Sequence, residues 1–292
     1  MNKFELKHQK TKSLSIKPNG RSSDFVTPNF ILSCNANCLY CYTYRFGRDK
    51  VYINDNIDEI LNKIDEHRLT LPVKVSNQTD EKYWTYDICC DTDLAFHWND
   101  YDWDKVLNYF INTPDIKAVF ATKFVNYKLL PYGNDKLRIR FSLMPQNIAD
   151  IVENSSLITH RIRAVNDFKK AGFDVHLNFS PVIIYDNWLK DYEDLFKLVD
   201  SMVDPSYKDS VFCEVIFLTH NEFLHNKNLN SGDEKSIKAE ELMWVPEIQE
   251  DKVSQYGGKN KRYNWVIKKE FIEQFKNLHE EIIPWCNIRY IF

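Results

Sequence analysis

The first residues whose types and spacing point to chemistry are three cysteines within one eight-residue stretch. They are Cys34, Cys38 and Cys41, and they follow the apolar run at 30–32. Cysteine thiolates hold iron–sulfur clusters, most often as a set of four ligands. A loop that offers three thiolates would leave one iron of a four-iron cluster open to a ligand from outside the protein. The pattern therefore predicts a [4Fe–4S] cluster with one exchangeable position.

Two other uses of closely spaced cysteines compete with this interpretation. A structural zinc ion needs four closed ligands, and the other four cysteines are scattered without a second Cys-x-x-Cys pair: Cys89, Cys90, Cys213 and Cys286. A disulfide framework requires an oxidising compartment, and no feature of the sequence indicates export. The cluster is favoured, while zinc and plain core cysteines stay open. We expect Cys213 and Cys286 to lie in the core.

Composition places the chain among soluble globular proteins. The 292 residues are 43% hydrophobic and 27% charged, with a net charge of −4. No apolar run approaches the ~20 residues that span a membrane, and residues 1–17 lack the apolar stretch of a signal peptide, so we expect a cytoplasmic protein without a membrane partner. The acidic balance is an argument against a general nucleic-acid coat, although a local basic patch remains compatible with it.

Strand-like and helix-like runs alternate along most of the chain. The expected strands are 30–33, 83–90, 118–121, 137–143, 173–179 and 211–218. Such alternation is typical of parallel βαβ units. Six strands are too few for a closed eightfold barrel, so we predict an α/β fold with a partial (β/α)6 TIM-like barrel. Residues 226–232 are expected to form a polar loop, and 286–292 a last strand.

This reading divides the chain into an N-terminal arm (1–28), the partial barrel (29–225) and a C-terminal extension on the substrate side (226–292). In barrels of this kind the chemistry lies in the loops at the C-terminal ends of the strands. Five residues with useful chemistry fall at or just past the expected strand ends: Cys34, Cys90, Lys123, Ser142 and Tyr185.

The spacing Cys-x3-Cys-x2-Cys resembles the cluster motif of the radical S-adenosylmethionine (SAM) superfamily. The resemblance implies that Cys34, Cys38 and Cys41 hold a [4Fe–4S] cluster whose open iron chelates the amino and carboxylate groups of SAM. It further implies reductive cleavage of SAM to a 5′-deoxyadenosyl radical, which abstracts a hydrogen atom from the substrate. A flavodoxin or ferredoxin would be the electron donor.

Further stretches resemble spore photoproduct lyases, which split a UV-induced thymine–thymine cross-link back into two thymines. They keep order and approximate spacing from about residue 28 to the end: 37–42, 88–93, 122–124, 140–142, 170–173, 181–185 and 288–290. The resemblance implies a radical SAM lyase that cleaves a carbon–carbon bond in DNA repair. A relative acting on a modified nucleotide, nucleoside or small metabolite stays open, as does a non-catalytic metal-binding interaction protein.

In that family the cysteine before a short Thr/Ser-Asp run returns a hydrogen atom to the thymine radical, and Cys90 matches it. A thiol can quench a carbon radical because its S–H bond is weak. Successive side chains on a strand face opposite ways, so only one of Cys89 and Cys90 would face the barrel interior. The alternative is that both are buried strand cysteines.

The resemblance also supports Tyr40 as a relay that returns the hydrogen atom so that SAM is regenerated, and leaves Tyr42 a packing or substrate role. Asp93 is expected to accept hydrogen bonds from SAM, Lys123 to pair with the SAM carboxylate as a point charge, and Ser142 to add a polar contact. Aromatic packing for the tyrosines and simple solvation for the lysine are the alternatives.

The best local signal for DNA is the basic stretch 252–269. Its cations alternate with Tyr256, Tyr263 and Trp265; cations neutralise phosphates and aromatic rings stack on extruded bases. Similar proteins approach the lesion with a glycine-bearing segment here, but Gln255 stands where an arginine is expected. A solvated basic loop is an equal alternative to a DNA clamp.

Overall fold

The computed structural model describes residues 5–43, 50–254 and 257–292. The strands are β1 (Glu5–Gln9), β2 (Lys17–Pro18), β3 (Phe25–Val26), β4 (Ile31–Leu32), β5 (Lys50–Asn54), β6 (Trp84–Asp87), β7 (Ile116–Thr122), β8 (Leu137–Leu143), β9 (Asp174–Val182), β10 (Phe212–Phe217), β11 (Thr219–His220), β12 (Gln249–Val253), β13 (Lys259–Tyr263) and β14 (Ile288–Ile291). The α-helices are α1 (Ile57–Arg68), α2 (Trp103–Asn112), α3 (Gln146–Val152), α4 (Ile158–Ala171), α5 (Trp188–Met202), α6 (Glu222–Leu229), α7 (Glu234–Met243) and α8 (Trp265–Ile282).

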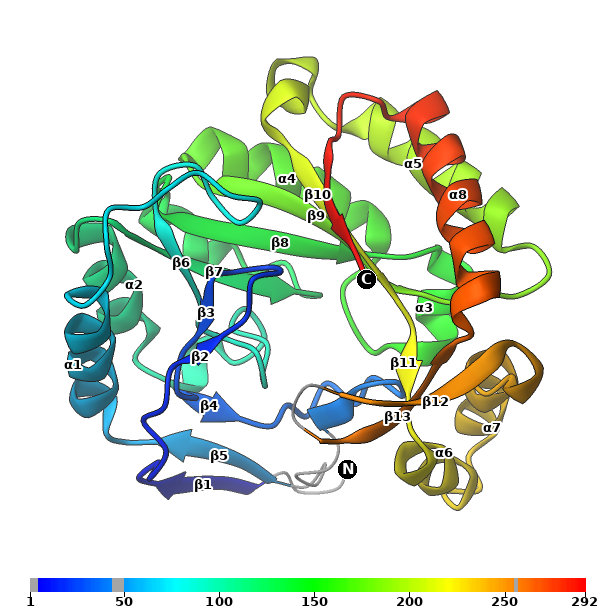
Figure 1. The fold of residues 1–292 in the computed structure, drawn as a ribbon, viewed down its shortest axis with the longest axis horizontal. Helices are drawn as coiled ribbons and strands as arrows, with labels where there is room; N and C mark the ends of the chain where they lie inside the picture. The colour runs from blue at the N-terminus through cyan, green and yellow to red at the C-terminus, as the bar shows by residue number, and fades with distance from the viewer. Residues whose placement is uncertain (1–4, 44–49, 255–256) are drawn as a thin grey trace.

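One eight-stranded sheet organises the described residues, in the order β14-β10-β9-β8-β7-β6-β3-β2. Its neighbours from β14 to β3 all pair in parallel, and β2 joins the edge antiparallel. The sheet curls, and its outer side is covered by α1, α2, α4, α5 and α8 (Figure 1). The predicted partial TIM-like barrel is confirmed.

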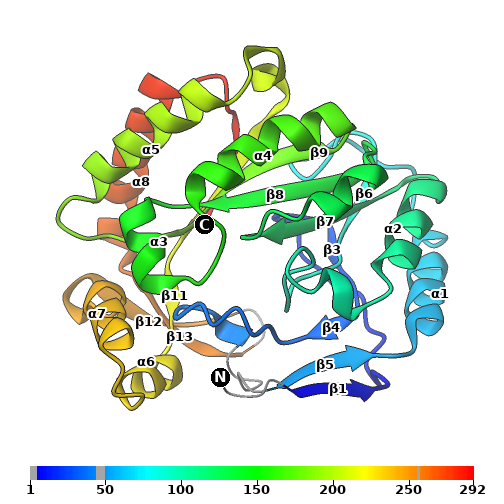
Figure 2. The same ribbon diagram turned by 180° about the vertical axis from the view of Figure 1, so that it is seen from behind.

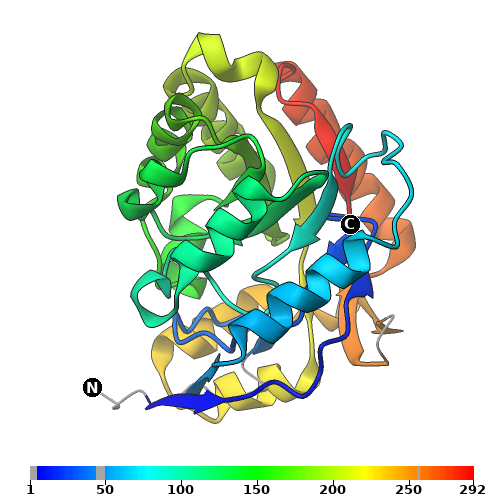
Figure 3. The same cartoon turned by 90° about the vertical axis from the view of Figure 1, so that its left-hand side faces the viewer.

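Two smaller sheets flank the barrel: β1-β5-β4, and β11-β13-β12. Helices α6 and α7 lie beside the hairpin of β12 and β13, below α3 in the view from behind (Figure 2). Seen from the side, α1 and α2 run next to each other on the same outer wall (Figure 3). No helix among the described residues is long and apolar enough to cross a membrane.

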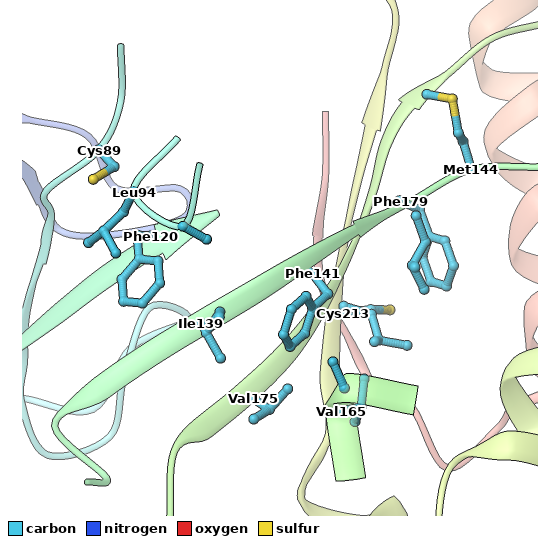
Figure 4. Close-up of a cluster of buried hydrophobic side chains, with 14 of the residues drawn as sticks. Cys89, Leu94, Phe120, Ile139, Phe141, Met144, Val165, Val175, Phe179 and Cys213 are labelled. Carbon is cyan, nitrogen blue, oxygen red and sulfur yellow. The ribbon is translucent and has the colours of Figure 1, made fainter. Parts of the chain in front are cut away.

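Alternation on the central strands separates an apolar outer face from a polar inner one. On β8, Ile139 and Phe141 point toward the helix layer, where Val165 of α4 and Val175 of β9 lie close by (Figure 4). The ring of Phe141 packs edge-on against Phe168 of α4, with centroids 5.3 Å apart. Burial of these side chains joins each helix to the outside of the sheet.

The inner face of the same strands carries buried ion pairs. Arg140 of β8 contacts Asp87 of β6 at 2.7 Å and Glu214 of β10 at 2.9 Å, and Arg289 of β14 contacts Glu214 at 2.7 Å. These contacts cross-link four strands of the sheet. Because removing one partner would leave a buried charge uncompensated, the network holds the strand ends in a defined register below the loops.

The first expected strand has a different place from the one predicted. Ile31 and Leu32 pair antiparallel with β5 in the β1-β5-β4 sheet, and the parallel series of the main sheet ends instead at β3, which pairs with β6. The apolar run 30–32 is compatible with a strand in either sheet. The local sequence pattern does not predict that this run pairs with residues 50–54. The division into 1–28, 29–225 and 226–292 stays an interpretation, since β3 and β14 from the outer two parts are strands of the main sheet.

Two local predictions were wrong. Strand β6 ends at Asp87, so Cys89 and Cys90 lie in the loop beyond it and the argument from strand alternation does not apply to them. The expected polar loop at 226–232 is in part helix, because α6 extends to Leu229. Its N-terminus is capped by Asn221, whose side chain accepts from the Leu224 amide at 2.8 Å.

Candidate active site

The three cysteines lie in a loop, residues 33–43, that leaves β4 and crosses the C-terminal ends of the barrel strands. We call it the cysteine loop. The Leu39 amide donates to the Val152 carbonyl at 2.8 Å, at the end of α3, and the Leu39 carbonyl accepts from Asn228 of α6 at 2.9 Å. Asn37 has a positive φ of 58°, which asparagine tolerates better than most residues. The loop is therefore fixed from two sides.

The thiols of the cysteine loop lie close enough to influence one another. Burial, the Asp93 carboxylate and the other two thiols raise the pKa of Cys34. Burial, Glu153 and Cys41 raise the pKa of Cys38 to about 12, partly opposed by Lys123. Three thiols in one loop would be held as thiolates only by a compensating positive charge, which is what a metal centre supplies. This donor set fits an iron–sulfur cluster.

Cys90 and Tyr42 face each other across the loop ends. The Tyr42 hydroxyl lies 3.5 Å from the Cys90 sulfur and donates to the Cys90 carbonyl at 2.5 Å. Cys90 is exposed whereas Cys89 is buried. Desolvation of the sulfur and the carboxylates of Asp87 and Asp91 raise the pKa of Cys90 to about 12. The thiol therefore keeps its proton at neutral pH.

Tyr40 points to a different partner. Its hydroxyl donates to the buried carboxylate of Glu153, which also contacts Arg161 at 2.7 Å and accepts from Ser155 at 2.7 Å. Arg161 continues to the Ser142 carbonyl at 2.7 Å. Burial by itself raises the pKa of Glu153, but Arg161, Lys123 and the Tyr40 hydrogen bond hold it below the ordinary value. The ionised carboxylate fixes the orientation of the Tyr40 ring within the cysteine loop.

The three residues expected to contact SAM gather at neighbouring strand ends. The Asp93 carboxylate accepts from Thr122 at 2.7 Å, from the Lys123 amide at 2.9 Å and from the Phe96 amide at 3.1 Å. The Lys123 ammonium lies 5.5 Å from the Tyr40 ring centroid. Ser142, at the end of β8, is buried and accepts from Asn178 at 3.3 Å. Asp93 thus has most of its acceptor capacity occupied by the protein itself.

Polar atoms that lack partners mark the same region. Within the described residues, Asn35 Oδ1, Thr92 Oγ1 and Asn178 Oδ1 are buried and have no hydrogen-bond partner. Buried polar atoms are nearly always satisfied, so unpaired ones call for an explanation such as a ligand. Asn178 is next to Ser142, and Thr92 is next to Asp93 in sequence. Sequence reasoning missed these three residues, and also Glu153 and Arg161, because single polar residues in loops and helices carry no pattern.

Comparison with known proteins identifies the family. The family model for spore photoproduct lyase matches residues 6–292. The chain belongs to the spore photoproduct lyase family. Curated spore photoproduct lyases of Bacillus subtilis and Clostridium acetobutylicum are 25% and 26% identical, over 70% and 60% of this chain. The matches span 59% and 52% of the length of those two relatives.

Solved spore photoproduct lyases share the fold. One complexed with the dinucleoside spore photoproduct has a TM-score of 0.82 at 17% identity, and covers 98% of this chain and 82% of its own. A cysteine-to-alanine variant with bound AdoMet and the same dinucleoside has a TM-score of 0.82 at 16% identity, with the same coverage. The expected family and fold are therefore confirmed.

The basic stretch of this family member is the β12–β13 hairpin and the start of α8. Two cations have partners in the hairpin itself: Lys252 contacts Glu250 at 3.0 Å, and Lys261 contacts Asp251 at 2.9 Å. Tyr263 is buried and its hydroxyl accepts from the Ile184 amide at 2.9 Å, so it does not offer a stacking face. Trp265 is 55% exposed. Gln255 and Tyr256 lie outside the described residues.

Proposed function

We propose that this chain is a radical SAM lyase that repairs a UV-induced thymine dimer by cleaving its carbon–carbon cross-link. The observation that carries the proposal is the contact between Tyr42 of the cysteine loop and Cys90. It brings the candidate hydrogen-atom donor, Cys90, next to the loop that would hold the cluster. Family membership supports the same reaction class. The shorter match to the curated relatives leaves activity and substrate to be tested.

Cys34, Cys38 and Cys41 would hold the [4Fe–4S] cluster, with SAM on the open iron. When bound, the cluster and SAM supply a 5′-deoxyadenosyl radical that removes a hydrogen atom from the substrate. Lys123 would pair with the SAM carboxylate, and Ser142 would contact SAM next to the unpaired Asn178 oxygen. Asp93 orients the Lys123 backbone and keeps a lone-pair site on Oδ2 for a SAM donor.

Cys90 acts after the cross-link has broken. Its S–H bond cleaves homolytically, the hydrogen atom passes to the carbon radical left on the thymine, and a thiyl radical remains on the sulfur. The Tyr42 O–H, 3.5 Å away, can then return a hydrogen atom to the thiyl, which restores Cys90 and leaves a phenoxyl radical. Tyr40 stays our candidate for the later relay to SAM, with its hydroxyl oriented by Glu153.

A second candidate function uses the same machinery on a smaller nucleotide or nucleoside. It is favoured by the hairpin, where Lys252 and Lys261 are paired with carboxylates and Tyr263 is buried, so that fewer groups remain for a DNA backbone. A cation already paired contributes less to phosphate binding than a free one.

The test is an anaerobic assay of the reconstituted protein with SAM and a flavodoxin, a ferredoxin or dithionite as reductant. We expect 5′-deoxyadenosine to form with each of the three reductants. We also expect the dinucleoside spore photoproduct to be converted to the repaired dinucleoside. Formation of 5′-deoxyadenosine without repair of either the dinucleoside or lesion-containing duplex DNA would favour the second candidate. A colourless protein that binds zinc and releases no 5′-deoxyadenosine would contradict both.

A further inference from the structure

A second group of side chains that could bind a metal lies outside the candidate active site. It is near α6, whose Asn228 donates to the Leu39 carbonyl of the cysteine loop. It consists of His220 on β11, His225 on α6 and Glu240 on α7, and one ligand atom of each lies within 4.8 Å of the others. We call it the His–His–Glu cluster. We propose that it is a binding site for a divalent transition-metal ion, with Zn²⁺ as the ion it fits best.

The geometry supports this because both imidazoles converge on one carboxylate. His220 Nε2 lies 2.9 Å and His225 Nδ1 lies 2.6 Å from Glu240 Oε2, and His220 Nε2 lies 3.2 Å from Oε1. Two imidazole nitrogens and one carboxylate oxygen are a known zinc ligand set, with bonds of about 2.0–2.2 Å. Tetrahedral angles at such bonds place the ligand atoms roughly 3.3 Å apart. The two nitrogen separations from Glu240 Oε2, 2.9 and 2.6 Å, would have to widen by about 0.4 and 0.7 Å to reach that value.

The surroundings fix the ligands as neighbours of a metal site usually do. The His225 ring stacks on Trp244, with centroids 4.0 Å apart and planes at 12°. Asn228 donates to Glu240 Oε1 at 2.5 Å. This bond from Asn228 occupies Oε1 and helps to hold the Glu240 carboxylate with Oε2 beside the two imidazoles.

His220 is fully buried, and its Nδ1 has no hydrogen-bond partner within the described residues. An ion bound to Nε2 would keep the ring proton on Nδ1 and leave that atom unpaired. This nitrogen therefore does not indicate a metal by itself, and the proposal rests on the convergence of the three ligand atoms. His225, with 17% of its side chain exposed, gives an ion a path to the cluster.

A second candidate group, Cys213, His279 and Cys286, is buried at all three positions. Its thiols and imidazole lie behind the aromatic layer of α5 and α8, where Phe196 and Phe275 contact the His279 ring. Like the His–His–Glu cluster it offers three ligands, but it has no exposed edge through which an ion, or a water as fourth ligand, could enter. The His–His–Glu cluster is therefore the better site.

The ion would act on the cysteine loop through Asn228. That side chain donates both to Glu240 and to the Leu39 carbonyl, which stands next to Cys38 in sequence. An ion at the cluster would cross-link β11, α6 and α7, and so hold Asn228 against the loop. The inference does not depend on the proposed substrate or on SAM chemistry.

The experiment uses the full chain with Cys34→Ser, Cys38→Ser and Cys41→Ser, so that the cysteine loop cannot take the ion. Zn²⁺ is titrated calorimetrically, and Co²⁺ is used as a spectroscopic probe. We expect one Zn²⁺ per chain, and visible Co²⁺ bands without the near-ultraviolet charge-transfer bands of thiolate ligands. No bound Zn²⁺, or Co²⁺ bands of thiolate type that vanish with Cys213→Ser, would overturn the proposal.

Three variants in the same background test where the ion binds. His225→Gln keeps a donor toward Glu240 but loses the imidazole, and should abolish measurable binding while the metal-free melting temperature stays close to its parent. Asn228→Ala should weaken binding by about 10–100-fold, as loss of a group that orients a ligand does. Cys213→Ser should leave the affinity unchanged. Undiminished binding by His225→Gln would overturn the assignment, and the Co²⁺ spectrum decides the matter if that variant does not fold.

Discussion

The hydroxyl of Tyr42 and the sulfur of Cys90 lie 3.5 Å apart, although 48 residues separate them in the chain. One comes from the cysteine loop and the other from the loop after β6. Desolvation of its hydroxyl, together with Cys90 and Asp91, raises the pKa of Tyr42, and the pKa of Cys90 is raised to about 12. Both groups are thus protonated at neutral pH and hold a transferable hydrogen atom.

Replacing Cys90 by alanine should separate bond cleavage from correct product formation. The Cys90→Ala variant is expected to form 5′-deoxyadenosine and to consume the lesion, but to give mostly adducts of the thymine radical, because the S–H donor is missing. Mass spectrometry of the products checks this. Cys89→Ala, at the buried neighbour, is the matched control and should repair cleanly. Clean repair by Cys90→Ala would exclude the donor role.

Replacing Tyr42 by phenylalanine should change how much SAM is consumed per repaired lesion, while the product stays the same. The phenol is the hydrogen donor 3.5 Å from the Cys90 sulfur, so without it the thiyl radical is not reduced by Tyr42 and each turnover is expected to consume a full equivalent of SAM. The ratio of 5′-deoxyadenosine released to lesion repaired measures this. The control is Tyr127→Phe. The exposed hydroxyl of Tyr127 donates to Asp167 at 3.0 Å, and its loss should leave the ratio unchanged. An unchanged ratio in Tyr42→Phe would leave Tyr40 as the sole relay candidate.

Removal of the cluster ligands should remove colour and radical formation together. Cys38→Ala is expected to lose the iron and the broad visible absorption of the anaerobically purified protein, and to release no 5′-deoxyadenosine, since two thiolates do not hold a [4Fe–4S] cluster. Iron and sulfide analysis are the measurements. Cys286→Ala, at a core cysteine, should retain both. A brown Cys38→Ala protein with full iron content would argue against the assigned ligand set.

Removing one partner of the buried Glu153–Arg161 pair should strongly destabilise the fold. Both side chains are buried and lie 2.7 Å apart, so Glu153→Gln leaves the guanidinium uncompensated and should cost about 3–5 kcal/mol of unfolding free energy. Urea denaturation measures it. Glu193→Gln, which breaks the exposed pair with Lys197, should leave the free energy nearly unchanged. An equally small change in unfolding free energy for Glu153→Gln would mean that the Glu153–Arg161 pair is better solvated than its burial indicates.

His279 should make the fold sensitive to mild acid. Burial lowers its pKa from 6.5 to about 4, so below pH 6.5 the unfolded chain binds a proton that the folded chain does not accept. Stability from this residue is therefore present above pH 6.5 and is lost as the pH falls toward 4, on the order of 3 kcal/mol in all. The free energy of unfolding is measured by denaturation at several pH values between 7 and 4. It should fall less steeply with decreasing pH in His279→Gln than in the control His160→Gln, which changes an exposed histidine. Equal slopes would contradict the assignment.

The sequence by itself determined the class of fold, and it predicts the chemistry of the cluster site. Three cysteines in eight residues constrain a ligand set locally, and alternating strand and helix patterns limit the topology to parallel units. Lys123 and Ser142 were expected at strand ends for the same reason, and they lie at the ends of β7 and β8; their contacts with SAM stay a prediction. These inferences rest on spacing along the chain, which needs no knowledge of distant contacts.

Only the tertiary structure decided which residues meet across that edge. Tyr42 rather than Tyr40 faces Cys90 because the loop after β6 crosses the cysteine loop at that point. Residues 226–229 are helical because Asn228 bonds both Leu39 and Glu240, a gain that outweighs the weak helical pattern of a polar stretch. Ile31 and Leu32 left the barrel sheet to pair with β5. Pairings of this kind join segments far apart in the chain, and a local pattern of apolar and polar residues does not encode which partner a segment will find.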